Sequence, residues 1–382
     1  MSKHAALFRS LNLGDGELAV VVKDCIDIAG YPTVAGSPAL ATAAPALRNA
    51  DVVDALLLGG CRIVGKANLH ELAFGVTGQN LFTGSPRNPL YPHLVPGGSS
   101  SGSAVAVAEG LVDFAIGTDT GGSIRTPAAC CGIVGLKPTF GRVSRKGASP
   151  QDSTLDCIGP LARTVAQIEQ AMAIIAPGYT GVENEDLSFA VIRPGFVDPD
   201  VMSMFDRALA SFSEEDLSAD LRYLELAHTA NLALIGHETF AAYGHLLASG
   251  MLGEDVARRL AAAATIGQRE ISEAERVRIL FRQEVDALLD RFDVIVTPTM
   301  PCFPLALADA GDAGAALRMT ALVRPFNLSG HPAITVPVIT DGNAPIGIQV
   351  IGRHGEDEVV CAFARRLERS LARSDNRKEA TR

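Results

Sequence analysis

The sequence predicts an α/β fold: a single domain with a mixed, largely parallel central sheet that helices cover on both faces. Three observations support this prediction. Strand-like and helix-like segments alternate early in the chain, no internal repeat is visible, and 47% of the 382 residues are hydrophobic while 20% are charged. This composition is close to that of globular proteins, so we expect a large core and exclude disorder for most of the chain.

The N-terminal segments are typical of a strand, a helix and a second strand. Residues 18–23 (LAVVVK) are rich in β-branched side chains and follow a Gly/Asp turn, which indicates a buried strand. Residues 51–58 (DVVDALLL) have helical apolar spacing, and residues 62–65 form the next strand-like run. This order predicts a βαβ unit and parallel strands.

The rest of the chain contains further segments of both kinds. We expect a lobe boundary in residues 178–200, which are rich in turn formers, and a frayed tail at the C-terminus. The predicted elements are helices at 104–110 and 356–371, a mainly helical region at 199–292, and strands at 112–119, 293–296, 333–338 and 346–351.

Charge and cysteine content narrow the choice of partners and compartment. The chain has 33 Lys and Arg against 43 Asp and Glu, a formal net charge of −10, which argues against nucleic acid and anionic membranes. Seven cysteines without a C-x-x-C pair predict reduced thiols in a cytoplasmic protein. No signal peptide is evident, and no uninterrupted apolar run reaches the roughly 18 residues of a membrane span.

Two segments rich in glycine and serine are candidates for chemistry. Residues 96–104 (PGGSSSGSA) could be a flexible linker, but they lead straight into a helix. They lack the G-K-[ST] ending of a phosphate-binding loop, so a backbone that approaches a reacting group closely is the remaining interpretation. In residues 117–132 (GTDTGGSIRTPAACCG), two glycines before Ser123 allow N–H groups to converge, either as an oxyanion hole or as an ordinary turn.

A serine nucleophile needs a base. None of the eight histidines lies in an H-E-x-x-H zinc motif, and no G-x-S-x-G elbow is evident whose serine would use a histidine as its base. A lysine can act as the base when burial keeps it neutral, and Lys23 ends the apolar run VVVK. The alternative is an ordinary strand-end lysine, extended to solvent beside Asp24.

An ordered series of motifs resembles the amidase signature family of serine amidohydrolases. The series consists of VVVKDCIDIAGYPTVAGS, IVGKANLHELAFG, VPGGSSSGSAVAVAEG, GTDTGGSIRTPAACCGIVGLKPTFGRVSRKG, DVIVTPTMP and RPFNLSGHPAITVPV. The resemblance covers most of residues 18–355 and is most specific in 95–147, whereas residues 180–290 resemble little. It implies the amidase-signature fold.

The resemblance also implies a catalytic triad of Lys23 as base, Ser99 as bridging serine and Ser123 as nucleophile. It places a cis peptide bond between Gly98 and Ser99, and it gives Lys66 a structural role. In the implied reaction a proton passes from Ser123 through Ser99 to Lys23, and an acyl-enzyme is hydrolysed by water without a metal or cofactor. The implied oxyanion-hole donors are the N–H groups of Thr120, Gly121, Gly122 and Ser123.

The implied organisation is a single amidase-like domain. It would span residues 1–375, with a signature core at 18–180, a variable helical region at 199–292, C-terminal strands and a helix at 293–371, and a frayed tail at 375–382. The lysine strand starts close to the N-terminus and lacks the Gly-Pro-rich lead-in of relatives. Relatives usually carry additional N-terminal helices, so part of their outer shell, or a dimer surface built from it, is expected to be missing.

The substrate is less defined than the reaction. Arg324 lies in a segment that lines the pocket in relatives, where it could bind a substrate carboxylate or be paired with an acidic residue of this chain. Arg125 is expected to brace the nucleophile loop. Aromatic residues are 5% of the chain and Trp is absent, which favours a small aliphatic or acidic amide.

Three functions follow from these observations. The first is a stand-alone amidase that converts a small-molecule carboxamide to a carboxylate and ammonia or an amine. The alternative is the glutaminase component of a tRNA-dependent amidotransferase, a kind of relative that needs an ammonia channel and a partner protein. A non-catalytic scaffold is the alternative of another class. A homodimer is left open.

Overall fold

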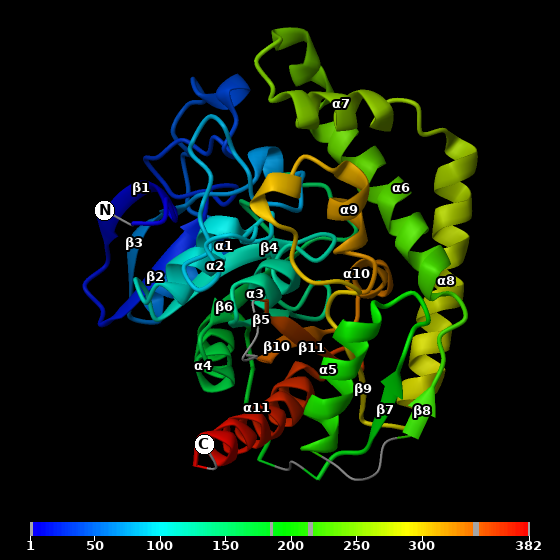
Figure 1. Ribbon diagram of the computed structural model, residues 1–382. Coiled ribbons are helices and arrows are strands. Elements are labelled where there is room, and N and C mark those ends of the chain that lie inside the picture. Colours follow the sequence, from blue (N-terminus) through cyan, green and yellow to red (C-terminus); the bar gives the residue numbers. More distant parts are fainter. Residues whose placement is uncertain (1–2, 184–185, 213–216, 339–343, 381–382) are drawn as a thin grey trace.

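A single eleven-stranded sheet forms the centre of the protein (Figure 1). The computed structural model describes residues 3–183, 186–212, 217–338 and 344–380. The strands, in their order across the sheet, are β1 (Leu7–Leu13), β3 (Cys61–Ala67), β2 (Leu18–Lys23), β4 (Phe114–Asp119), β6 (Cys157–Ala162), β5 (Val134–Lys137), β10 (Ala333–Val338), β11 (Ile346–Gly352), β9 (Val294–Pro298), β7 (Phe189–Ile192) and β8 (Leu217–Ala219).

The predicted βαβ unit is confirmed. Strand β2 pairs in parallel with β3 on one side and with β4 on the other. Helix α1 (Asp51–Leu58) lies between β2 and β3 in the chain, and α2 (Ser101–Ala108) lies between β3 and β4. The carboxyl ends of β2 and β4 therefore open at the same edge of the sheet, where ligands bind in open α/β sheets.

The mixed sheet is confirmed, but the prediction that it is largely parallel is wrong. Of the ten strand pairs in the described residues, four are parallel and six are antiparallel. The reason is visible at β10 and β11, since the residues between them, 339–345, are too few for the crossover that parallel strands need. They form an antiparallel pair instead.

Helices cover both faces of the sheet, as predicted. In β2, Val20 and Val22 belong to one hydrophobic cluster while Val21 belongs to another, because successive side chains of a strand point to opposite faces. Helix α1, α4 (Val165–Ile175) and the C-terminal helix contribute to the first cluster. Helix α2 and the short α3 (Arg125–Cys130) contribute to the second.

The region predicted to be helical is confirmed, with one added strand. Helices α6 (Leu224–Tyr243) and α8 (Gln268–Leu289) pack side by side along one flank of the sheet, and α7 (Glu254–Ala263) lies away from the sheet at the top of Figure 1. Helix α5 (Pro199–Ala210) comes first, and β8 adds an edge strand. Where a lobe boundary was expected, β7 instead joins the same sheet by pairing with β9.

The C-terminal helix is longer than predicted. Helix α11 runs from Asp357 to Ala380, so the segment expected to be a frayed tail from residue 375 is helical as far as Ala380, and residues 381–382 lie outside the described residues. Residues 374–380 include Arg, Lys, Glu and Ala, which are good helix formers. No helix in the described ranges is long and apolar enough to cross a membrane.

Candidate active site

Lys23 lies at the end of β2 and is completely buried. Its Nζ donates to Ser99 Oγ and to Thr118 Oγ1, at 2.8 Å each. No carboxylate of the described residues lies within ion-pair distance of it. Burial lowers the pKa of the Lys23 amine, because the charged form loses its hydration, although Cys25 and nearby aspartates oppose this. The interpretation of Lys23 as a solvent-extended strand-end lysine is therefore wrong.

The neighbouring acid, Asp24, does not serve Lys23. Asp24 Oδ1 forms an ion pair with Lys66 Nζ at 2.7 Å, and both side chains are fully buried. Lys66 also donates to the carbonyl of Pro32 and to the hydroxyl of Thr33. The structure thus places Lys66 in an internal ion pair and leaves the Lys23 amine among neutral hydroxyls.

Ser99 lies in a tightly packed turn that begins α2. The peptide bond between Gly98 and Ser99 is cis, as the resemblance implied. A side chain at Gly98 would meet the backbone of Gly78 at 2.9 Å, so the chain passes too close here for another residue. The serines of this run are fully buried, which contradicts a flexible linker. The hydroxyls of Ser100 and Ser103 bind backbone carbonyls of β4, and Ser99 is the one that contacts Lys23.

Ser123 follows a sharp turn between β4 and α3. Gly122 has φ of +102°, and a Cβ there would lie 2.2 Å from Val323 Cγ2, so both conformation and space require glycine. The carboxylate of Asp119 accepts from the N–H groups of Gly122 at 2.7 Å and Ile124 at 3.1 Å. This geometry corrects the implied oxyanion hole, because the Gly122 N–H is already bonded within the loop.

Three of the four implied oxyanion donors remain available. Within the described ranges, no protein acceptor binds the N–H groups of Thr120, Gly121 and Ser123. The carbonyl of Ser123 accepts from the Ser100 N–H at 3.2 Å, so the two serine-bearing segments are in direct contact. The Ser123 residue is half-buried and lies at the wall of a cavity.

Arg125 braces the loop that carries Ser123, as expected. The buried guanidinium donates to Asp119 twice and to the side chains of Asn327 and Gln349 at 2.6 Å each. Burial alone would raise the pKa of Asp119, but the Arg125 charge and these hydrogen bonds bring it well below its ordinary value. The ionised Asp119 carboxylate therefore stabilises the turn around Ser123 by accepting hydrogen bonds from N–H groups of that turn.

Arg324 enters the same cavity as Ser123 without an acidic partner. It begins α10 (Arg324–Ser329), its Nε donates to Thr320 Oγ1 at 2.7 Å, and its Nη1 donates to Asn231 Oδ1 at 3.1 Å. A Cβ on Gly121 would lie 2.6 Å from Nη1, so the guanidinium rests against the nucleophile loop. Burial, with Arg259 nearby, lowers the pKa of Arg324 to about 10. In the described part of the chain no carboxylate pairs with it, which contradicts the alternative of an internal ion pair.

The cavity that contains these groups has a volume of about 1030 Å³. Its lining includes Gly121, Ser123 and Arg324, most of residues 71–82, and residues of α6 and α7. Its lining is largely apolar around a few polar groups, which is typical of a small-molecule site.

The sequence analysis did not single out two residues that the structure adds to the site. Thr118 lies one residue before the end of β4 and shares the Lys23 amine with Ser99. Asn231 lies on α6, where it binds Arg324 and donates to the carbonyl of Thr120. Thr118 could have been found from its place within the GTDTGGS motif, but no local pattern marks Asn231.

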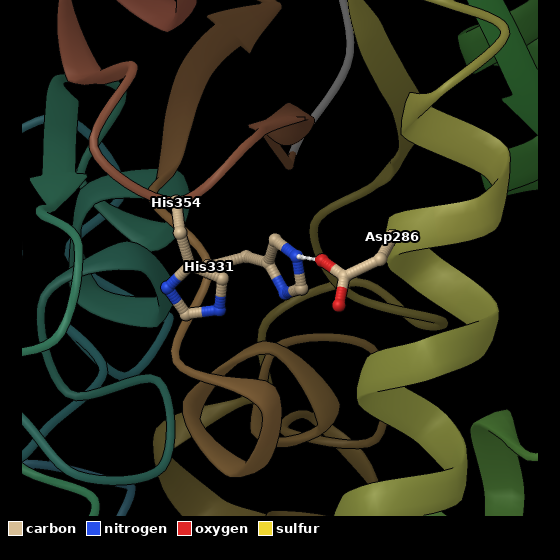
Figure 2. Close-up of side chains that lie close together, drawn as sticks. All are labelled: Asp286, His331 and His354. Carbon is tan, nitrogen blue, oxygen red and sulfur yellow. Dashed lines mark hydrogen bonds and ion pairs between the residues drawn. The ribbon is translucent and has the colours of Figure 1, made fainter.

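A second group of chemically active side chains lies outside this cavity. Figure 2 shows Asp286, His331 and His354, which have the residue types of a metal site and whose ligand atoms lie within 4.8 Å of one another. His331 Nε2 is 2.9 Å from Asp286 Oδ1 and its Nδ1 is 2.9 Å from Ser329 Oγ, while His354 Nε2 is 3.0 Å from the Ser329 carbonyl. These three ring nitrogens are therefore hydrogen-bonded to protein oxygens. The bond between Asp286 and His331 connects α8 to the segment that leads into β10.

Comparison with known proteins decides the family. Residues 17–191 and 196–361 match the family model described as Amidase. The chain belongs to the amidase family. As a member of this family it is a hydrolase of amide C–N bonds, and its fold is the amidase-signature fold.

Curated relatives of the chain include components of the Glutamyl-tRNA(Gln) amidotransferase from several organisms. The chain is 35% identical to the A-type component of the Glutamyl-tRNA(Gln) amidotransferase of Halobacterium salinarum, covering 92% of this chain and 95% of the relative. Identity to the corresponding component from Methanospirillum hungatei is also 35%, covering 94% of each chain. These relatives favour the alternative of an amidotransferase component over a stand-alone amidase.

Solved structures of the amidase family have the same fold. The A-type component of the Glutamyl-tRNA(Gln) amidotransferase from Thermotoga maritima superposes with a TM-score of 0.84 at 30% identity, covering 96% of this chain and 87% of that one. A structure described as an amidase gives a TM-score of 0.83 at 32% identity, covering 93% and 84%. A vestigial protein complex related to an s-triazine catabolic enzyme gives 0.85 at 28%, covering 94% and 84%.

Proposed function

We propose that this amidase hydrolyses the carboxamide of a small substrate that also carries a carboxylate, with glutamine as the first candidate, and releases ammonia. One observation carries the proposal: Ser123 lines the same cavity as the guanidinium of Arg324, which no carboxylate of the described residues neutralises. Ser99, which is paired with the buried Lys23, belongs to the adjacent segment, whose Ser100 N–H donates to the Ser123 carbonyl. The names of the curated relatives support glutamine, which offers both a carboxamide and a carboxylate.

The proposed chemistry is acyl transfer through a serine. Ser123 Oγ attacks the amide carbonyl, its proton passes to Ser99, and the Ser99 proton passes to the neutral Lys23 amine. The N–H groups of Thr120, Gly121 and Ser123 stabilise the oxyanion. The proton then returns through Ser99 to the leaving nitrogen, which departs as ammonia, and water hydrolyses the acyl-enzyme by the same relay in reverse.

Arg324 gives the proposed site its preference for an anionic substrate. A buried guanidinium is costly without a counter-charge, and its present partners, Thr320 and Asn231, are neutral. A substrate carboxylate would supply that negative charge. It would accept hydrogen bonds from Nη2 and from the second N–H of Nη1 of Arg324. The carboxamide of the same molecule would then lie over Ser123, because Arg324 rests against Gly121.

Partner proteins are part of this proposal. The curated relatives are components of an amidotransferase, and we infer that this chain likewise delivers ammonia to a partner protein. The net charge of −10 argues against direct contact with nucleic acid or an anionic membrane, and seven free cysteines favour the reducing cytoplasm.

A second candidate is a stand-alone amidase with a larger substrate. The cavity of about 1030 Å³ exceeds what a molecule of the size of glutamine fills, and this observation favours an amide with a longer acyl group. The two candidates share the reaction and differ in the substrate and in the need for a partner.

The test is ammonia release by the purified chain from glutamine, asparagine, short dicarboxylic acid monoamides and neutral aliphatic amides. Faster ammonia release from glutamine than from neutral amides supports the first candidate. Faster release from longer amides than from glutamine supports the second. A fluorophosphonate should label the wild type and not Ser123→Ala. Labelling that survives in Ser123→Ala, or no ammonia from any amide, would contradict the proposed nucleophile.

A further inference from the structure

Three hydrogen bonds connect α7 and the residue before it, which line the cavity, to the adjacent residues 70–74. His70 Nε2 donates to Asp255 Oδ2 at 3.0 Å, the Gly253 N–H donates to Glu71 Oε2 at 2.9 Å, and Arg259 Nη1 donates to the carbonyl of Phe74 at 2.7 Å. We refer to these contacts, between residues 70–74 and 253–259, as the α7 latch.

One side of the latch is anchored directly at the catalytic serines. The His70 N–H donates to the carbonyl of Ser99 at 3.1 Å, so the residue that holds α7 also holds the bridging serine. The His70 side chain is almost fully buried and lies against Gly75, where a Cβ would be 2.0 Å from Nε2. Glu71 is fixed in turn, since Ser37 Oγ donates to its Oε1 at 2.6 Å. This side of the latch is therefore rigid.

The other side of the latch has fewer supports of its own. Helix α7 packs on α6 and on the 3₁₀ turn Gly244–Ser249, and it lies away from the central sheet (Figure 1). Burial alone would raise the pKa of Asp255, but the His70 hydrogen bond and the Arg259 charge bring it down to about 2, so the carboxylate is ionised. A charged acceptor between two donors is a strong contact, because charge-assisted hydrogen bonds exceed neutral ones.

The face of α7 that the latch orients is part of the cavity. Residues Asp255, Arg259 and Ala263 recur at a spacing of four and line it together, as one helical face. Ile266, just beyond the helix, and Ile235 on α6 continue this wall with apolar side chains. Because Ser123 and this wall line the same cavity, we expect a long acyl chain on a Ser123-bound substrate to contact the wall more than a short one does.

We propose that His70 is a positioning residue that, with Glu71 and Phe74, fixes α7 as the wall that selects acyl groups by length. This inference rests on the proposed function, because it takes Ser123 as the reacting group. It assigns the latch to substrate selection and not to the chemical step.

The experiment compares two probes of Ser123, so that no substrate need be known. The purified protein is labelled with diisopropyl fluorophosphate and with a fluorophosphonate that carries a dodecyl chain, and the ratio of the two second-order rate constants is measured. The variants are His70→Leu, Asp255→Asn and His70→Gln, since a glutamine amide can donate near the position of Nε2. Glu273→Gln is the matched control, because Glu273 forms an exposed pair with Arg276 on α8 and does not line the cavity.

We expect the long-probe to short-probe ratio to fall about tenfold in Asp255→Asn and His70→Leu, the loss typical of one hydrogen bond to a charged group. It should recover in His70→Gln and stay at the wild-type value in Glu273→Gln. A ratio unchanged in both Asp255→Asn and His70→Leu would overturn the role of the latch. Absence of labelling in the wild type would instead contradict the proposed function, so the two failures are distinct. If His70→Leu does not fold, Asp255→Asn decides alone, since it alters only the α7 side.

Discussion

Replacement of Arg324 by methionine separates substrate recognition from catalysis. The methionine side chain fills much of the same volume but removes the charge and all hydrogen-bond donors. Ser123, Ser99 and Lys23 do not contact Arg324 through any hydrogen bond in the described residues, so we expect these proposed catalytic groups to stay in place. We expect the variant to lose activity on carboxylate-bearing amides and to keep its activity on neutral ones.

The size of the loss follows from the donors that Arg324 has left. Its Nε and one N–H of Nη1 are bonded to Thr320 and Asn231, which leaves the second N–H of Nη1 and both of Nη2 for a ligand. Hydrogen bonds to a charged group contribute about 1.5–3 kcal/mol, so two of them in a partly buried site are worth roughly 2–4 kcal/mol after desolvation. This corresponds to a decrease in kcat/KM of about 30- to 1000-fold.

The assay is ammonia release from a dicarboxylic acid monoamide and from its neutral diamide counterpart. Arg324→Met should lower kcat/KM for the monoamide by the stated factor and change that for the diamide by less than about threefold. Arg324→Lys should lie between, since it retains the charge without the planar fork. An equal decrease for both amides would refute the reasoning. The melting temperature of Arg324→Met should stay close to that of the wild type. The substitution removes a buried cation that has no counter-charge, and burial of such a cation costs free energy in the folded protein.

Four further predictions concern the loop that carries Ser123 and the buried lysine. Lys23→Met should reduce turnover by about 10²- to 10⁴-fold, the contribution of a general base, while circular dichroism shows the fold retained. The pH profile of kcat/KM should show an acidic limb from Lys23, whose pKa is lowered by burial, because only the neutral amine accepts a proton; a profile that is the same in wild type and Lys23→Met would count against this assignment. Since that pKa is lower in the folded than in the unfolded chain, the same group should make stability decline as pH falls from about 10.5 toward the folded pKa, which urea unfolding at several pH values would detect. Gly122→Ala should destabilise the protein by about 1–3 kcal/mol, because φ is +102° and the new methyl would meet Val323, and thermal unfolding equal to that of the wild type would contradict it.

The local patterns named the right residues but left their roles open. The run VVVK allowed either a buried lysine or one extended to solvent, and two glycines before Ser123 allowed either an oxyanion hole or an ordinary turn. The family resemblance favoured the first in each case, and the structure shows Lys23 buried and Gly122 at a positive φ. The availability of individual N–H groups could not be read in this way. Gly122 is bonded to Asp119 because Arg125 and Asn327 hold that carboxylate, and Asn327 is distant in the chain.

The sheet shows the same division between local and distant information. The N-terminal βαβ unit was predictable because an intervening helix fixes the direction of the next strand. The antiparallel pairs of β4, β5 and β6 depend on which strand edge a chain segment reaches after a long irregular loop, and hydrophobic periodicity does not encode that. The polar contacts of α7 were likewise invisible, since charged helix residues are usually solvated.

The brace around Arg125 has a consequence for synthesis of the chain. Its guanidinium is held by Asp119, by Asn327 and by Gln349, so the turn that presents Ser123 depends on residues that leave the ribosome more than two hundred positions later. A nascent or truncated polypeptide lacking β11 carries the serine without the geometry that would activate it. If Ser123 is the nucleophile, as we propose, hydrolytic competence therefore requires β11, and a polypeptide that ends before Gln349 should be inactive although it contains the serine.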